Sequence, residues 1–408
     1  MGDPVFLKRV VLTNFKSIKG CIVNLGPLTF LVGQNGAGKS NFLDALRLVT
    51  EALSTTLEHA LRDRGGINEV RRRSTGHPTH FGMRLDWALP DGTQGTYAFR
   101  VGARPKGGFA VQQEECTVVG PPLSEEHYFS VHSGRLKATS FGRSGPPAVN
   151  DRLYLVSAAS MHEFRPLFDA LSHMGFYNLN PDVIRELQPP DPGEILQRDG
   201  RNLASVLARM AREKSPARTQ IIEFLSRIVP GLDDVGVRLV LRKETLEFKQ
   251  VVNAAKARWR FPAESMSDGT LRALGVLTAL LQSGNNGDRS VPLVGIEEPE
   301  LALHPGAAGI LRDALRTASR TAQVIVTSHS PDLLDDKEIL DQHLLAVVNR
   351  NGETLIGPPD ASDRASMRDR LYTAGELLRM SRIEPDEKAA RPEAVQLELF
   401  PDMPSCRK

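Results

Sequence analysis

The sequence has few cysteines, almost no net charge and no long apolar run. Its three cysteines, Cys21, Cys116 and Cys406, are widely spaced and odd in number, which fits neither a disulfide framework nor a zinc motif. The 51 Lys and Arg residues nearly balance 49 Asp and Glu residues, so any contact with nucleic acid would need a local basic patch. No apolar run is long enough to span a bilayer, and the N-terminus lacks the apolar core of a signal peptide. We therefore expect a soluble cytoplasmic protein with no membrane partner.

The sequence also has no internal repeat and no long heptad pattern, which argues against a coiled-coil tether. What is present is ordinary for a globular protein, with 40% apolar and 25% charged residues. A chain of 408 residues is long enough for two or three domains.

Residues 33–40 are the most informative segment. They fit the pattern G-x-x-x-x-G-K-[ST] at every position, after a short β-rich run at 28–32 and before apolar residues at helical spacing at 41–49. In this strand–loop–helix context, N–H groups at the start of the helix bind phosphate oxygens. The sequence therefore predicts a nucleoside triphosphate site, with Lys39 on the β- and γ-phosphates and the Ser40 hydroxyl on Mg²⁺. The predicted binding residues are Gly33, Gln34, Asn35, Gly36, Ala37, Gly38, Lys39, Ser40 and Asn41.

A second apolar run, residues 291–296, ends in two carboxylates, Glu297 and Glu298. Such a run is a weak signal alone, but the end of a parallel strand beside a phosphate loop is where a Mg²⁺-coordinating acid belongs. We predict that Glu297 belongs to the metal shell and that Glu298 is the general base for the attacking water.

Two further positions have alternative interpretations. His329 follows the apolar run 323–327, so it is either an ordinary turn residue or a sensor of the γ-phosphate, and its place in the chain favours the sensor. The turn from Ser267 to Thr270 opens an apolar helix at 271–281. It is either a capped helix or a second anion-binding helix N-terminus.

The remaining pattern lies between these motifs. Residues 79–140 alternate apolar and polar positions between turn dipeptides, which predicts an antiparallel β layer. Helical spacing follows at 201–214 and 219–229. The arginine-rich stretch 62–73 is either a solvated loop or a basic patch near the nucleotide.

In this order the motifs resemble the ABC-type ATPase heads of the SMC/RecF/OLD superfamily, and more narrowly the compact AAA-family ATPases of bacterial repair and anti-phage defence loci. The resemblance covers residues 4–350 and rests on "LTNFKSI", "GQNGAGKSN", "SDGTLRALGVLTALL", "GIEEPELALHP" and "VIVTSHSP". It implies ATP as the nucleotide and an α/β, P-loop NTPase fold of the ABC/SMC-head type, with an antiparallel β layer and a helical insertion lobe.

The resemblance also implies residue roles. Ser267 and Gly269 belong to the signature motif that completes a partner subunit's ATP site, Glu297 and Glu298 form the Walker B pair, and His329 is the switch histidine. Residues 300–305 correspond to the D-loop. This sequence departs from transporter ATPases, because the metal-shell acid is Glu and the signature reads Ser-Asp-Gly-Thr. Gln112 and Gln113 are candidates for the Q-loop glutamine by location only.

We predict four parts. These are an N-terminal ATPase lobe with the P-loop and the β layer at 1–155, a helical/β insertion lobe at 156–260, a C-terminal ATPase lobe at 261–383, and a disordered, proline- and charge-rich tail at 384–408.

The resemblance implies a homodimer in which two heads sandwich two ATP molecules and hydrolyse them. We expect the cycle to serve DNA repair or anti-phage defence, with DNA as a candidate ligand. An effector protein would act in trans, because the stretch after the last core strand is too short for the nuclease domain of OLD-type proteins. The alternative is a nucleotide-gated scaffold that holds a toxin or nuclease and does not process DNA.

The tail contains one further signal, the segment Gln396, Leu397, Glu398, Leu399 and Phe400. It resembles the Q-L-x-L-F peptide by which bacterial proteins dock on the DNA polymerase sliding clamp. Two interpretations stay open: a flexible peptide that binds the clamp, or a terminal segment that packs back on its own domain.

Overall fold

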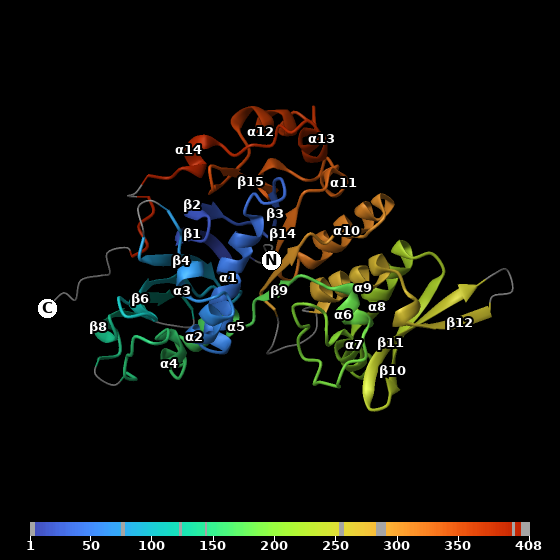
Figure 1. The fold of residues 1–408 in the computed structure, drawn as a ribbon, viewed down its shortest axis with the longest axis horizontal. Coiled ribbons are helices and arrows are strands. Elements are labelled where there is room, and N and C mark those ends of the chain that lie inside the picture. Colours follow the sequence, from blue (N-terminus) through green and yellow to red (C-terminus); the bar gives the residue numbers. More distant parts are fainter. Residues whose placement is uncertain are drawn as a thin grey trace.

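The computed structural model describes residues 5–74, 78–121, 125–142, 145–252, 257–282, 291–393 and 396–400. Within these residues the strands form three sheets. Figure 1 shows an antiparallel β layer on one side, a central sheet and a small third sheet on the far side. No helix in the described ranges is long and apolar enough to cross a membrane.

The β layer follows the alternation in the sequence. Leu12, Met83 and Phe99 lie opposite one another on three neighbouring strands and are fully buried, so one face of the layer is core and the other is outer. In spatial order the strands are β2 (Ile18–Asn24), β1 (Leu7–Phe15), β4 (His80–Ala88), β5 (Gln94–Ala103), β6 (Phe109–Val119), β7 (His127–His132) and β8 (Arg135–Thr139).

The central sheet carries the P-loop. In spatial order its strands are β16 (Glu353–Gly357), β15 (Leu344–Arg350), β3 (Leu28–Val32), β14 (Gln323–Ser328), β13 (Leu293–Glu297) and β9 (Gly175–Tyr177). All neighbours are parallel except β15 and β16. Every residue of β3 and β14 is buried, as in a parallel sheet covered on both faces. Because parallel strands end at the same edge, the loops after β3, β13 and β14 meet there.

Helices cover both faces of this sheet (Figure 1). On the side of the β layer are α1 (Lys39–Ser54), α2 (Leu57–Arg62), α3 (Ile67–Val70), α4 (Leu155–Ala158) and α5 (Arg165–Ser172). On the other side are α6 (Pro181–Arg185), α7 (Leu203–Arg212), α8 (Pro216–Ile228), α9 (Asp268–Leu281) and α10 (Ala308–Ala318), with the small sheet of β10 (Leu232–Val240), β11 (Lys243–Val252) and β12 (Ala257–Pro262). Near β15 and β16 lie α11 (Pro331–Leu334), α12 (Ala361–Arg368), α13 (Ala374–Arg379) and α14 (Glu387–Ala390).

Successive residues of β3 point into two different cores. Leu31 packs in the core that contains Phe42 of α1, whereas Phe30 packs in the core that contains Leu274 of α9. The P-loop helix α1 and the helix α9, which begins at the signature turn, therefore cover opposite faces of the central sheet.

The structure differs from the predicted division at residue 156. β9 pairs with β13 inside the central sheet, and the Thr50 hydroxyl of α1 donates to the Leu171 carbonyl of α5 over 3.0 Å. Residues 156–177 therefore belong with the P-loop lobe and not with the insertion lobe. The reason is that local periodicity does not show which sheet a three-residue strand joins.

The structure also differs from the predicted disordered tail at 384–408. α14 lies inside that range, and Leu399 is only 3% exposed because it packs on the β layer. Residues 394–395 and 401–408 lie outside the described residues. The tail composition was misleading because the apolar side chains of a short segment can pack on a surface formed by residues far away in the sequence.

Candidate nucleotide-binding and hydrolysis site

The P-loop has a backbone that only glycine can build at several positions. Gly36 and Gly38 have φ values of +77° and +104°, in the left-handed region that disfavours other residues. A Cβ atom on Gly33 would lie 2.0 Å from the Val347 carbonyl oxygen, and one on Gly38 would lie 2.1 Å from Thr354 Oγ1. Gly38 is the N-cap of α1 and contributes no capping side chain, so N–H groups of the first helical turn are free to face an anion.

Lys39 points back into the P-loop. It is 5% exposed, and its Nζ donates to the carbonyl oxygens of Gly33 at 2.8 Å and Gln34 at 3.1 Å. Glu298 Oε1 lies 3.9 Å from the same nitrogen. Burial lowers the pKa of Lys39, while the charges of Glu298 and Glu300 act in the opposite direction. The ammonium group is thus held by two carbonyl oxygens that phosphate oxygens can replace.

Two hydroxyl groups support the P-loop from behind. Thr354 Oγ1 of β16 donates to the Ala37 carbonyl at 2.9 Å and lies 2.7 Å from Ser17 Oγ in the turn between β1 and β2. Asn41, a predicted binding residue, donates from its side-chain amide to Ser17 Oγ at 2.7 Å. No local pattern predicted a role for Thr354, and Ser17 was included only in the motif "LTNFKSI".

Glu298 has an unusual backbone conformation. Its φ of +43° lies in the left-handed region, which costs a non-glycine residue about 1–3 kcal/mol and is concentrated at functional sites. The Glu298 N–H donates to the Thr327 carbonyl of β14 at 3.0 Å, which fixes this conformation. As a result, Glu298 Oε1 lies 3.2 Å from His329 Nδ1. The three predicted catalytic residues, Lys39, Glu298 and His329, therefore lie together at one edge of the sheet.

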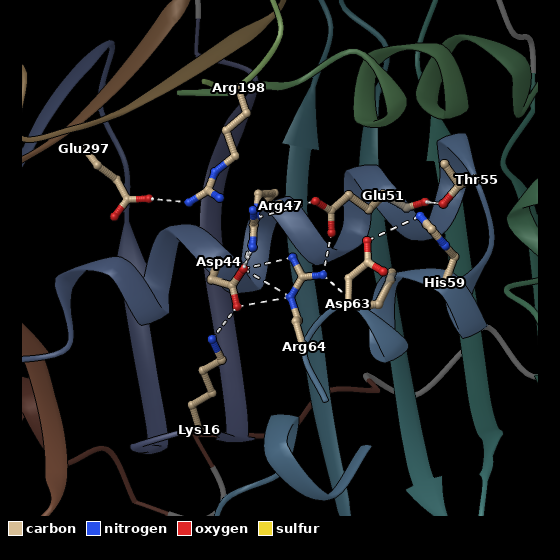
Figure 2. Close-up of polar contacts among 11 residues, drawn as sticks. Lys16, Asp44, Arg47, Glu51, Thr55, His59, Asp63, Arg64, Arg198 and Glu297 are labelled. Carbon is tan, nitrogen blue, oxygen red and sulfur yellow. Dashed lines mark hydrogen bonds and ion pairs between the residues drawn. The ribbon is translucent and has the colours of Figure 1, made fainter. Parts of the chain in front are cut away.

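Glu297 faces a different partner. Figure 2 shows its carboxylate pointing toward Arg198, whose Nη2 lies 3.2 Å from Glu297 Oε1. Ser40 is exposed at the start of α1. The described residues contain no group of three or more His, Cys, Asp or Glu side chains that could hold a metal ion. This donor set fits Mg²⁺ nevertheless, because Mg²⁺ usually takes one or two protein ligands together with phosphate oxygens and water.

Glu300 is a third acidic residue at the site, and it was predicted only as part of the D-loop. Its Oε1 accepts a hydrogen bond of 2.6 Å from Ser328 Oγ, while its buried Oε2 has no partner among the described residues. Burial raises the pKa of Glu300 above its usual value. The bond ties the D-loop to the residue just before His329.

Arg272 of α9 was not predicted. It is 8% exposed and donates to the main-chain carbonyls of Leu179 at 2.7 Å, Glu298 at 3.2 Å and Glu297 at 3.3 Å. Burial lowers the pKa of Arg272, and the acidic residues Glu300, Glu298 and Glu297 act against this shift. The guanidinium group thereby connects the signature helix to the acidic end of β13.

The signature turn begins α9, which packs in a different core from the P-loop helix α1. Ser267 is exposed and caps α9, with its Oγ accepting from the Thr270 N–H at 3.2 Å. A Cβ atom on Gly269 would lie 2.3 Å from the Ala302 carbonyl oxygen, so this glycine allows α9 to approach the D-loop closely. Among the hydrogen bonds and ion pairs between described residues, none joins Ser267 or Gly269 to Lys39, whose partners are Gly33, Gln34 and Glu298.

A buried ion-pair network fixes α1 beside the P-loop (Figure 2). The Asp44 carboxylate pairs with Lys16 at 2.6 Å, Arg47 at 2.5 Å and Arg64 at 2.9 Å. Arg64 also pairs with Glu51. Burial alone would raise the pKa of Asp44, but the three cations hold it well below its usual range. Arg64 of the arginine-rich stretch therefore stabilises the packing of α1 through buried ion pairs. It is neither a solvated loop residue nor available to bind phosphate.

Other candidates have simpler environments. The Gln113 amide donates to Glu115 within β6, and the Gln112 side chain lies against Gly102 of β5, so both remain unassigned as Q-loop residues. Asp335 and Asp336 pair with Arg379 of α13 and Arg316 of α10, respectively.

The P-loop, the acidic strand end and the histidine at one edge of a parallel sheet, beside an antiparallel layer, define a P-loop ATPase head of the ABC type. Solved structures agree on the fold. An SMC head bound to the C-winged helix domain of ScpA superposes with a TM-score of 0.54 and 13% identity, covering 88% of this chain and 99% of that one. An SMC head with an extended coiled coil, bound to the C-terminal domain of ScpA from Pyrococcus furiosus, gives a TM-score of 0.53 and 11% identity, covering 90% and 99%.

The chain belongs to the family described as "AAA domain, putative AbiEii toxin, Type IV TA system", which matches residues 28–335. The Old nuclease of Escherichia phage P2 is 24% identical over 361 residues, which cover 82% of this chain and 58% of that protein. The OLD nuclease of Thermus scotoductus is 26% identical over 349 residues, which cover 81% and 60%. This chain therefore spans less than two thirds of these relatives. The predicted resemblance to an SMC/OLD-type head is confirmed.

Proposed function

We propose that this protein binds ATP with Mg²⁺ and hydrolyses it. The observation that carries the proposal is the convergence of Lys39, Glu298 and His329, with the Glu298 carboxylate 3.9 Å from Lys39 Nζ and 3.2 Å from His329 Nδ1. Lys39 and the loop N–H groups would bind the phosphates, and Ser40 and Glu297 would hold Mg²⁺, which neutralises charge on the transferred group.

The attacking water needs a base near the γ-phosphate. Glu298 is suited to this role because its backbone is fixed by Thr327 and its carboxylate is directed toward the P-loop. His329 contacts the same carboxylate, so it is positioned to respond to the γ-phosphate and to orient Glu298.

We further propose that ATP joins two copies of the chain. Ser267 and Gly269 lie at the start of α9, on the opposite face of the central sheet from α1, and Ser267 is exposed. A second copy would place its own Ser267 turn over the triphosphate, where the helix N-terminus favours an anion. ATP would then bind the closed pair better than the single head, which shifts the equilibrium toward the dimer until hydrolysis.

The cycle is proposed to serve DNA repair or anti-phage defence, with an effector in trans. The names of the family and of the two nuclease relatives support this direction. The alternative, a nucleotide-gated scaffold that holds a toxin or nuclease, is supported by the same family description. Docking on a sliding clamp through Gln396, Leu397, Leu399 and Phe400 stays a prediction, and it would require Leu399 to leave its buried position.

Phosphate release by the purified chain, measured with and without DNA, tests the proposal. We expect Mg²⁺-dependent hydrolysis that Lys39→Ala abolishes, because the substitution removes the cation from the phosphates. Stimulation by DNA favours the DNA-associated function, and indifference to DNA favours the scaffold. Hydrolysis that is unchanged in Lys39→Ala would contradict the assignment of the site.

A further inference from the structure

The C-terminal segment, residues 396–400, lies on the outer face of the β layer, away from the residues that would bind ATP. Leu399 is 3% exposed, and Leu397 and Phe400 are partly covered, while Gln396 and Glu398 are exposed. Figure 1 shows this red end of the chain beside the β layer.

Two glycines create the groove that receives the segment. Gly20 of β2 and Gly82 of β4 both pair with Thr13 of β1, so the three residues form a row across neighbouring strands. A Cβ atom on Gly20 would lie 2.5 Å from Leu397 Cδ1, and one on Gly82 would lie 2.2 Å from Leu399 Cδ1. The two leucines therefore occupy the space that side chains would take at any other residue type.

The next strand along the same row provides a third contact, between Arg100 and Phe400. Gly82 pairs with Arg100 of β5, and the Arg100 guanidinium carbon lies 5.2 Å from the centre of the Phe400 ring. This distance fits a cation–π interaction. The groove thus accepts a segment of the pattern Leu-x-Leu-Phe, with the intervening Glu398 directed to solvent.

Side chains rather than backbone hold the segment. The N–H groups of Gln396 and Leu397 donate to the carbonyl of Glu393, which precedes the segment in the chain. Among the hydrogen bonds between described residues, none joins the backbone of residues 396–400 to a strand of the β layer. The segment is therefore not held by the series of backbone hydrogen bonds that an added edge strand would form with the sheet.

We propose that this groove is a peptide-docking site and that residues 396–400 are a releasable latch that occupies it in cis. Burial of three apolar side chains and the ordering of five residues are opposing free-energy terms of similar size, so docking is only marginally favourable. A cavity of about 700 Å³, lined by Pro392 and Gln396 among others, adjoins the N-terminal end of the segment. Release exposes both the groove and the Leu-Phe peptide. The proposal does not depend on ATP hydrolysis.

A labelled peptide with the sequence of residues 391–401 tests the latch in the full chain, by fluorescence anisotropy. In the open variant, Leu397→Asp/Leu399→Asp, the latch cannot dock. We expect the peptide to bind this variant at least about tenfold more tightly than the wild type. The reason is that the tethered segment of the wild type competes for the groove at high effective concentration. Glu398→Gln is the matched control, because this exposed position should leave binding at the wild-type level.

A second pair of substitutions locates the groove. Gly20→Ala and Gly82→Ala, added to the open variant, should remove peptide binding, because the new methyl groups fill the space of the two leucines. The three atoms nearest to a Cβ on Gly20 all belong to Leu397, so Gly20→Ala alone tests the groove if the double substitution affects folding, as judged by thermal unfolding. The proposal is overturned if the open variant shows no saturable binding, if it binds no better than the wild type, or if Gly20→Ala has no effect.

Discussion

At the scale of single residues, Glu298 combines a strained backbone conformation with the proposed role of general base. The account predicts that Glu298→Gln lowers ATP turnover by about 10²–10⁴-fold, because the amide cannot take a proton from the attacking water. ATP affinity should change little, since the P-loop and Lys39 remain. Single-turnover hydrolysis and equilibrium binding of a labelled nucleotide separate these effects.

The control for this experiment is Glu338→Gln, at an exposed carboxylate that pairs with Arg316 far from the P-loop in sequence. It should hydrolyse ATP at the wild-type rate. A Glu298→Gln variant that turns over within a few-fold of the wild type would mean that another group, such as Glu300, is the base.

The protonation of Glu114 should affect the free energy of unfolding. It is fully buried in β6 and accepts hydrogen bonds from the Tyr154 N–H, the Leu155 N–H and the Tyr97 hydroxyl. Burial raises its pKa to about 7 from a value of 4.5, although the hydrogen bonds oppose the shift. The folded state therefore holds this proton more tightly than the unfolded state.

The direction of the pH dependence is set by this difference in proton binding. Between pH 4.5 and 7 the folded state binds more protons at this group, so the free energy of unfolding contributed by Glu114 falls as the pH rises, by about 3 kcal/mol in all. Urea unfolding at a series of pH values should show this decline in the wild type and in the exposed-site control Glu126→Gln. Glu114→Gln should lose that decline, and an equal slope in this variant would show that the titrating group lies elsewhere.

At the scale of elements, the contact between β16 and the P-loop makes a distinct prediction. Thr354→Val removes the hydroxyl that donates to the Ala37 carbonyl but keeps the side-chain shape. Loss of a hydrogen bond of about 0.5–1.5 kcal/mol should weaken ATP binding by about 2- to 12-fold. Thr354→Ser keeps the hydroxyl and should bind within about twofold of the wild type, as measured by calorimetry. Equal affinity in the valine and serine variants would mean that the hydroxyl does not shape the loop.

The same contact illustrates what the sequence could and could not predict. The P-loop, the acidic strand end and His329 each have a local pattern, because strand, turn and helix place them by spacing within a few residues. Thr354 and Arg272 have no such pattern, because their partners lie 317 and 93 residues away and are met only after the sheet has formed. The strand β9 was missed for a related reason, since three residues are too few for a periodicity.

At the scale of the whole molecule, the central sheet separates the two halves of the proposed ATP site. Leu31 and Phe30, neighbours in β3, pack in the cores of α1 and α9 respectively, so the helices that begin at the P-loop and at the signature turn cover opposite faces of the sheet. The two halves are therefore expected to be complementary surfaces of two copies, in an arrangement related by twofold symmetry.

Mixing two inactive variants shows whether two copies of the chain share each ATP site. Lys39→Ala lacks a working P-loop but keeps Ser267, whereas Ser267→Arg blocks the signature turn but keeps Lys39. In a mixed dimer, one of the two sites combines the intact P-loop of one copy with the intact turn of the other. An equal mixture should therefore recover about a quarter of the wild-type ATPase rate, since half of the dimers are mixed and each has one intact site of two. A mixture no more active than the sum of its separate components, with both variants folded, would contradict the shared site.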